Sequence, residues 1–339
     1  MTDTSAIPNA PAAASLTERT RRVEAGASVV AVAFIKDTAV FVLGEELALL
    51  VPEDGEPQRV TMHAGGILCA ACDSTRIVTG GDDGQVVALD AGGAVTLLAT
   101  DDKRRWIDQV ALHRDGTVAW SAGKDAFVLP RKGEIRRLAV PSTVGGLAFA
   151  PKGLRLAIAH YDGVTLWFPN AKAEPERLGW KGSHVGVSFS PDGRFLVTAM
   201  QEPALHGWRV SDSKHMRMTG YAEKVRSMDW SVDGAALATS GASQLVVWPF
   251  VGKDGPMGKE PRLLAPFQAL VTTVACHPRE AVVAAGYDNG MALLIRLEDG
   301  AEIVAKAPGG GAMMALAWNR SGSRLAFGTE DGEAGVITV

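Results

Sequence analysis

The sequence contains little of what several specialised protein classes require. Three cysteines in 339 residues are too few for a disulfide framework. No apolar run approaches the ~20 residues that cross a bilayer, and residues 1–22 lack the apolar core of a secretory signal. The formal net charge is −4, whereas nucleic-acid scaffolds are usually basic. These absences predict a cytoplasmic protein with neither a membrane nor a nucleic-acid partner.

Glycine is abundant in this chain, whereas aromatic residues are few. The chain has 38 glycines and 6% aromatic residues, a balance that favours short strands and turns over helices. The Ala/Pro/Ser-rich stretch at residues 1–15 predicts a flexible tail. The sequence therefore predicts one all-β domain over residues 16–339.

A position that closes a short apolar run recurs every 37–46 residues. In most copies a polar or glycine-containing turn follows it, as in FSPDG at residues 189–193. The recurring positions are Phe34, Cys72, Leu112, Phe149, Phe189, Trp230, Cys276 and Trp318. A period of this length is typical of a repeat architecture.

The residues before this position alternate in size. Two residues earlier the side chains are mostly bulky and apolar: Val32, Ala70, Val110, Leu147, Val187, Met228, Val274 and Leu316. One residue earlier they are mostly small: Ala33, Ala71, Ala111, Ala148, Ser188, Asp229, Ala275 and Ala317. Because successive strand residues point to opposite faces, this period of two predicts that every unit begins with a strand.

Three further runs complete most units. The second run ends in a polar turn with Asp and Gly, as at 80–84 and 286–290, and such turns suit tight hairpins. A third apolar run and a more polar fourth run follow. Four antiparallel strands cannot bury both faces of their sheet alone, whereas sheets stacked radially can.

These motifs resemble those of the WD-repeat β-propeller family. Phe189 to Gly193, Thr198 and Trp208 match the family pattern in one unit. Thr79, Asp83, Gly84 and Asp90 match it in another, with Leu89 at the tryptophan position, and Trp167 and Trp248 occupy that position in their own units. The family often joins His, Ser/Thr, Asp and Trp in a hydrogen-bonded tetrad, and no unit here has all four.

The pattern predicts eight four-stranded blades, with seven as the alternative. Seven units run through all four strands, and an eighth begins at Met313 and stops at Val339 after three. Residues 19–26 resemble other fourth strands. We expect them to complete the last blade, because this closes the ring and removes two open sheet edges.

Known catalytic and metal-binding patterns are not assembled in the sequence. Cys69 and Cys72 lie three apart on a predicted strand, so their side chains point to opposite faces and serve as core. The seven histidines are scattered, and Asp229 is the only acid in the small column. GxSxG is absent, and the glycines of PGGGAM (308–313) lack the Lys-Ser/Thr of a phosphate loop. The sequence predicts no catalytic residue, metal or cofactor.

One face of the predicted ring collects aromatic and basic residues. The connections between units and the turns between second and third strands share this face. Its proposed protein-binding residues are Arg104, Arg105, Trp106, Tyr161, Trp180, Lys181, Tyr221, Phe267 and Tyr287, with Lys103, Lys124, His160 and Lys224 nearby. Aromatic residues and Arg are enriched at binding hot spots, and rigidly held loops commonly carry function.

Two functions follow as hypotheses. The first is a non-catalytic scaffold that holds a protein or peptide on this face. The second is an enzyme or a small-ligand or metal-binding protein that uses the central channel. On the opposite face, residues 251–262 form the longest insertion, and its Gly, Pro and Lys content predicts solvated flexibility.

Overall fold

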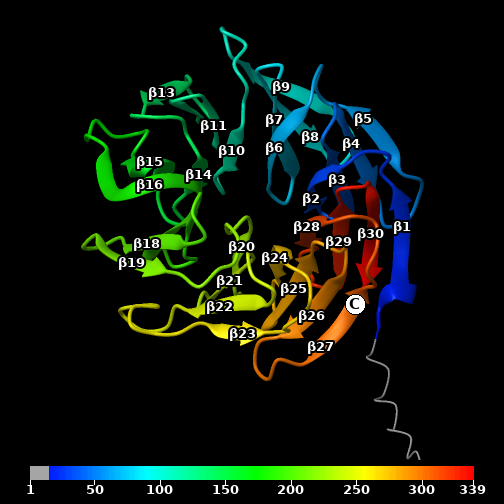
Figure 1. The fold of residues 1–339 in the computed structure, drawn as a ribbon. Coiled ribbons are helices and arrows are strands. Elements are labelled where there is room, and N and C mark those ends of the chain that lie inside the picture. Colours follow the sequence, from blue (N-terminus) through cyan, green and yellow to red (C-terminus); the bar gives the residue numbers. More distant parts are fainter. Residues whose placement is uncertain (1–14) are drawn as a thin grey trace, which may run out of the picture.

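The computed structural model describes residues 15–339 and shows a ring of antiparallel sheets around a central axis (Figure 1). The predicted flexible tail falls almost wholly on residues 1–14, outside the described part. Apart from the short 3₁₀ helix η1 (Thr17–Arg19), the regular elements of residues 15–339 are strands. In that range no helix is long and apolar enough to cross a membrane. The all-β β-propeller prediction is confirmed.

Five sheets have four consecutive strands each. The first two contain β2 (Val29–Ile35), β3 (Thr38–Leu43), β4 (Leu47–Val51) and β5 (Gln58–Thr61), then β6 (Ile67–Cys72), β7 (Arg76–Gly81), β8 (Gln85–Asp90) and β9 (Val95–Thr100). The third contains β10 (Gln109–Leu112), β11 (Val118–Ala122), β12 (Asp125–Leu129) and β13 (Arg136–Ala139). The other two contain β20 (Met228–Trp230), β21 (Ala236–Thr239), β22 (Leu245–Pro249) and β23 (Arg262–Leu264), then β24 (Val271–Cys276), β25 (Val282–Tyr287), β26 (Ala292–Arg296) and β27 (Glu302–Lys306).

The sixth sheet has six strands and corrects the predicted count of separate blades. It contains β14 (Gly146–Phe149), β15 (Leu156–Trp167), β16 (Glu176–Phe189), β17 (Phe195–Met200), β18 (Leu205–Arg209) and β19 (Lys214–Met218). The units beginning near Val144 and Val185 both lie in it, because β16 runs without a break from the end of one into the start of the next. The described residues therefore form seven sheets, and the prediction of eight separate blades is wrong. Seven, the alternative, is reached by joining two units and not by losing one.

The long strand β15 itself bends back at Asp162 and Gly163, both of which have positive φ. Its first half pairs with β14 and its second half with β16. Across the bend, the Nε2 atom of His160 lies 2.9 Å from the Oγ1 atom of Thr165. Each half of β15 thus occupies the place of one strand in a four-stranded unit.

The seventh sheet closes the ring with both ends of the chain. It contains β1 (Thr20–Glu24), β30 (Glu333–Thr338), β29 (Arg324–Thr329) and β28 (Met313–Trp318). β1 pairs antiparallel with β30 from Thr20↔Ile337 to Glu24↔Glu333, which confirms the predicted closure. Arg21 also donates hydrogen bonds to the carbonyls of Pro52, Glu53 and Gly55, which tie β1 to the next sheet.

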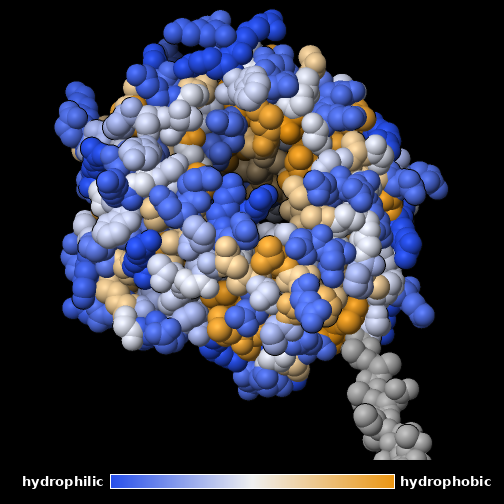
Figure 2. All heavy atoms as spheres, viewed as in Figure 1, coloured by the Kyte–Doolittle hydropathy of each residue, from blue (hydrophilic) through white to orange (hydrophobic). Residues whose placement is uncertain are grey.

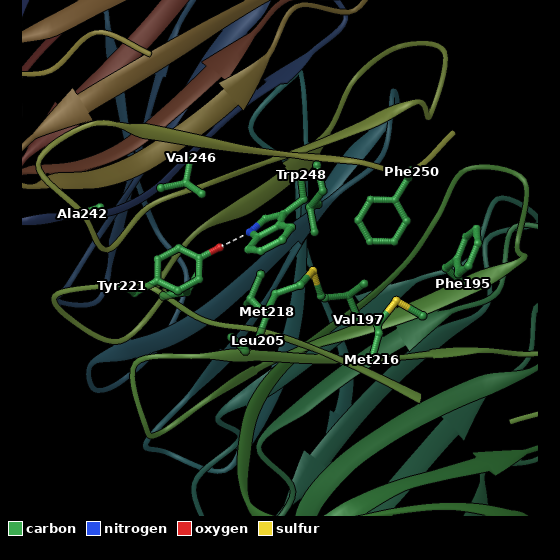
Figure 3. Packing of buried hydrophobic residues seen from close by; sticks show 13 residues of the cluster. Phe195, Val197, Leu205, Met216, Met218, Tyr221, Ala242, Val246, Trp248 and Phe250 are labelled. Atoms are coloured by element: carbon green, nitrogen blue, oxygen red, sulfur yellow. Dashed lines mark hydrogen bonds between the residues drawn. The ribbon is translucent and has the colours of Figure 1, made fainter. Parts of the chain in front are cut away.

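Apolar residues fill the spaces between neighbouring sheets, as the period of two requires. The middle strands are almost continuously buried, for example β3, β17 and β29. The outer strands are far more exposed, as in β9. Figure 3 shows one such layer, in which Trp248 and Phe250 from one sheet pack with Leu205, Met216 and Met218 from the next.

Candidate functional site

The connections between units and the turns after the second strands interlock on one side of the ring, here called the loop face. At nearly every unit a connection and a neighbouring turn share a backbone hydrogen bond. Examples are Ile67 N to Glu45 O, Asp101 N to Gly84 O, Val144 N to Gly123 O, Gln201 N to Ser183 O, Asp288 N to Leu270 O and Glu330 N to Ala312 O. Because these bonds recur around the ring, the loops are fixed to the sheets and present a preorganised surface.

The connection 101–106 shows this construction most clearly. Its Arg105 donates to the carboxylate of Asp101 at 2.6 Å and to that of Asp125 at 2.7 Å. It also donates to the Ala122 carbonyl at 3.0 Å. The hydrogen bonds from Arg105 lower the pKa of Asp101. Burial raises the pKa of Asp125, but the bonds from Arg105 and Arg137 outweigh it and hold that pKa low. Arg105 is therefore a structural clamp and not a free binding residue.

The clamp leaves its two neighbours facing solvent. Trp106 is 66% exposed, the highest value among the large apolar side chains of residues 15–339. Arg104 is exposed and has a φ of 50°, in the left-handed region that non-glycine residues rarely occupy. Its backbone lies against Gly84, where a Cβ atom would come within 2.9 Å of the Arg104 Cα atom. The geometry thus holds an arginine and a tryptophan outward side by side.

Other predicted binding residues are also exposed on the loop face. Tyr161 is 51% exposed at the bend of β15, and its amide is held by the Ser142 hydroxyl at 2.8 Å. Phe267 is 43% exposed in the connection between β23 and β24. Lys181 is exposed within β16. These residues sit on separate units of the ring.

Three predicted binding residues are turned inward. Tyr287 is fully buried, and its hydroxyl donates to the Ala265 carbonyl at 3.2 Å. Tyr221 is buried, and its hydroxyl lies between Thr239 Oγ1 at 2.8 Å and Trp248 Nε1 at 2.7 Å (Figure 3). Trp180 is half-buried and stacks on His206 with ring centroids 4.0 Å apart. The position of these residues near loops did not predict their burial, because the groups that each ring packs against lie elsewhere in the sequence.

The family tetrad is replaced by different side chains in different units. Three units keep its threonine: the hydroxyls of Thr79, Thr198 and Thr239 each donate to a carbonyl of the next strand. His63 contacts Thr79 at 2.8 Å and Asp83 at 3.1 Å, a triad that sequence reasoning missed because His63 lies outside the matched motif. His184 contacts Thr198 at 2.7 Å, and Tyr221 takes the histidine role beside Thr239.

A histidine without hydrogen bonds lies near the outer edge of the six-stranded sheet. His206 is fully buried, and neither of its ring nitrogens has a partner among residues 15–339. Its ring packs against those of Trp180, Trp208 and His215. Burial, together with His215, His184 and Arg217, lowers the pKa of His206 to about 3. The side chain is therefore a neutral aromatic filler at physiological pH.

The central channel opens on the loop face beside the starts of the inner strands. Figure 2 shows one face hollowed at its centre, with hydrophobic residues on part of the rim. The position four before each recurring anchor includes Leu68, Val185 and Met314, which are 40%, 37% and 41% exposed. A pocket of about 550 Å³ at this mouth is lined by Arg226, Thr272 and Met314, among others. The sequence could have predicted this rim, because its residues stand four positions before the recurring position of each unit.

Residues 15–339 contain no group of three or more His, Cys, Asp or Glu side chains that could hold a metal ion. Cys69 Sγ faces the Ile107 carbonyl of the next unit, and Cys72 Sγ faces the Phe34 carbonyl of the preceding one, so they point apart as predicted. Cys72 is exposed, which corrects its assignment to the core. Asp229 accepts hydrogen bonds from the Trp230 and Cys276 amides, and burial raises its pKa to about 6.

Most residues of the insertion 251–262 are exposed to solvent, and the rest of the insertion packs on a neighbouring unit. Arg209 donates to the Asp254 carboxylate at 2.6 Å, and Arg194 donates to the Gly252 carbonyl at 2.8 Å. Gly255 is buried against the ring of Phe195, and Met257 joins the apolar cluster of Figure 3. The insertion therefore covers the joint between two units.

Comparison with known proteins identifies the fold and nothing finer. No protein-family model and no curated protein sequence matches the chain. The computationally designed Ika8 protein is similar at a TM-score of 0.77 and 16% identity, over 94% of this chain and 98% of that one. The C-terminal WD40 domain of Sif2 is similar at 0.75 and 13% identity, over 94% and 97%. With its antiparallel sheets in a closed ring, the chain has the fold of a WD40-like β-propeller.

Proposed function

We propose that the protein is a non-catalytic scaffold that binds a protein or peptide on its loop face. The observation that carries the proposal is the exposed Trp106, held outward by the Arg105 clamp on a connection bonded to two neighbouring turns. A large aromatic ring on a rigid base is typical of a binding hot spot, because little entropy is lost when a partner covers it.

Three predicted residues remain in the proposed site with Trp106: Arg104, Tyr161 and Phe267. All three are exposed. Lys181 stays in the site as a more distant basic residue. Arg105 and Trp180 support the surface from below, whereas Tyr221 and Tyr287 belong to the core.

The test compares Trp106→Ala and Tyr161→Ala with Val232→Ala, an exposed apolar residue at the turn after β20 on the opposite face. Peptides are selected from a random displayed library with the wild-type chain. The two loop-face variants should lose these peptides by tenfold or more, since hot-spot truncation commonly removes more than 1 kcal/mol. Equal retention by all three variants contradicts the proposed face.

A second candidate is a small-ligand site at the channel mouth, favoured by the pocket beside Arg226 and Met314. Metal analysis of purified protein and a screen with hydrolase and dehydrogenase substrates test it. A stoichiometric metal or measurable turnover supports this candidate over the scaffold. We place it second because no cluster of His, Cys, Asp or Glu that could hold a metal ion occurs within residues 15–339.

A further inference from the structure

Charge is divided unevenly around the loop face. Exposed basic side chains cluster where the connection 101–106 meets the turn between β11 and β12: Lys103, Arg104 and Lys124. Exposed acidic side chains lie on turns of the two sheets that adjoin at the ring closure, here called the closing sheets: Glu45 and Glu46 in the first sheet, Glu330 and Asp331 in the seventh. A partner of one charge sign is therefore attracted to one part of the face and repelled by the other.

The basic residues around Trp106 are not used by the fold. Within residues 15–339, the side chains of Lys103, Arg104 and Lys124 form no ion pair within 4.0 Å and make no hydrogen bond. Arg105 by contrast is fully engaged with Asp101 and Asp125. The exposed Asp102 beside them, and Asp82 and Asp83 on the turn that contacts Arg104, offset part of the local positive charge.

The three basic residues are held near one another by the clamp between them. Arg105 joins the connection to the turn that carries Lys124, through Ala122 and Asp125. Lys103 and Arg104 precede Arg105 directly, and Trp106 follows it. The exposed indole thus belongs to the same connection as Lys103 and Arg104, and the clamp joins this connection to the turn that carries Lys124.

Resting on the proposed function above, we propose that the partner of this surface is an acidic peptide whose carboxylates engage Lys103, Arg104 and Lys124. An apolar or aromatic residue of the peptide packs on Trp106. The free cations supply charge complementarity, and the ring supplies the apolar contact that simple ion attraction lacks. The acidic turns of the closing sheets keep such a peptide on this part of the face.

The experiment selects peptides from a random displayed library with the full-length protein and then measures synthetic hits by fluorescence anisotropy. The proposal expects enrichment of Asp and Glu together with an apolar residue. The variant Lys103→Glu/Arg104→Glu should weaken binding of these hits about tenfold or more at 50 mM salt. The loss should shrink at 500 mM salt, because salt screens exposed charges.

A matched control reverses two exposed charges on turns of the opposite face, Arg131→Glu and Lys172→Glu. It should leave binding unchanged, while Trp106→Ala should weaken it about as much as the charge reversal. Thermal unfolding of each variant verifies that the fold is intact.

Each other outcome counts against a distinct claim. Selected peptides that depend on Trp106 but are neutral or basic overturn the acidic partner and leave the binding face standing. Peptides that are insensitive to Trp106→Ala overturn both. Equal binding of a single-stranded oligonucleotide, lost in the same charge reversal, shows that the patch reads negative charge alone and overturns the peptide assignment.

Discussion

Two connections between units, 101–106 and 219–224, each carry one aromatic residue, at different places in the connection and with opposite exposure to solvent. Trp106 points into solvent, whereas Tyr221 folds back into the core. The difference lies in what the adjoining strands offer. Thr239 and Trp248 give the Tyr221 hydroxyl two hydrogen bonds, whereas Asp101 and Asp125 beside Trp106 are taken by Arg105. In these two connections the aromatic ring is exposed where the polar groups beneath it are already paired, and buried where they are free to bond it.

The largest expected effect comes from removing Trp248, which packs against the connection 219–224 with the buried Tyr221, here called the inward connection. Trp248→Ala should lower the free energy of unfolding by about 3–5 kcal/mol, because it leaves a large cavity and removes a partner of Tyr221. Chemical denaturation measures this. A loss under 1 kcal/mol would show that Tyr221 is not packed as described.

The connection 101–106 with the exposed Trp106, here called the outward connection, should contribute less to stability when its clamp Arg105 is removed. Arg105→Ala should lower the free energy of unfolding by about 1–3 kcal/mol, since two buried carboxylates lose their partner while the guanidinium itself is partly solvated. Arg104→Ala is the matched control and should change stability by less than about 0.5 kcal/mol. Equal effects of the two changes would remove the distinction between clamp and free arginine.

Removing one oxygen from the inward connection should give an intermediate effect. Tyr221→Phe should lower the free energy of unfolding by about 1–2 kcal/mol, because Thr239 and Trp248 lose the hydroxyl. Tyr161→Phe, at an exposed hydroxyl, serves as the control and should be neutral. An unchanged stability for Tyr221→Phe would show that the hydroxyl bonds contribute nothing net.

Low pH should destabilise the connection 101–106 and leave the connection 219–224 unchanged. Arg105 holds the pKa of Asp101 below its usual 3.8, so its carboxylate stabilises the fold above that pH and the stabilisation is lost as the pH falls further. Burial raises the pKa of Tyr221 to about 12, so this group is neutral throughout the acid range. Hydrogen exchange, corrected for intrinsic rates, should show protection lost below pH 4 at 101–106 and retained at 219–224. Parallel loss in both would argue against the clamp.

The smallest expected effect on stability is that of Trp106→Ala, within about 0.5 kcal/mol. Its fluorescence should nevertheless change, because the exposed indole emits at longer wavelength than the buried ones. The emission maximum of the variant should shift to shorter wavelength. A clear loss of stability would mean that Trp106 packs under its loop.

The sequence predicted the repeat, the strands and the ring closure. These features depend on the alternation of large and small side chains along each strand and on turn residues, and both recur in every unit. It did not predict the joined sheet, since nothing in Lys181–Gly182–Ser183 distinguishes a break from an extended passage. Nor did it separate Trp106 from Tyr221, because burial of a loop side chain depends on residues such as Thr239, which lie on another strand. His63 was missed because it lies in the connection before its unit, outside the motif that contains its partners Thr79 and Asp83.

Site-specific cross-linking tests most directly whether the loop face at Trp106 is the recognition surface. A photoreactive phenylalanine replaces either Trp106 or Val232 on the opposite face, and each protein is irradiated with a labelled pool of acidic peptides selected by the wild-type chain. Adducts should form at position 106 and not at 232. Equal labelling at both positions, or labelling at 232 alone, would contradict the assignment.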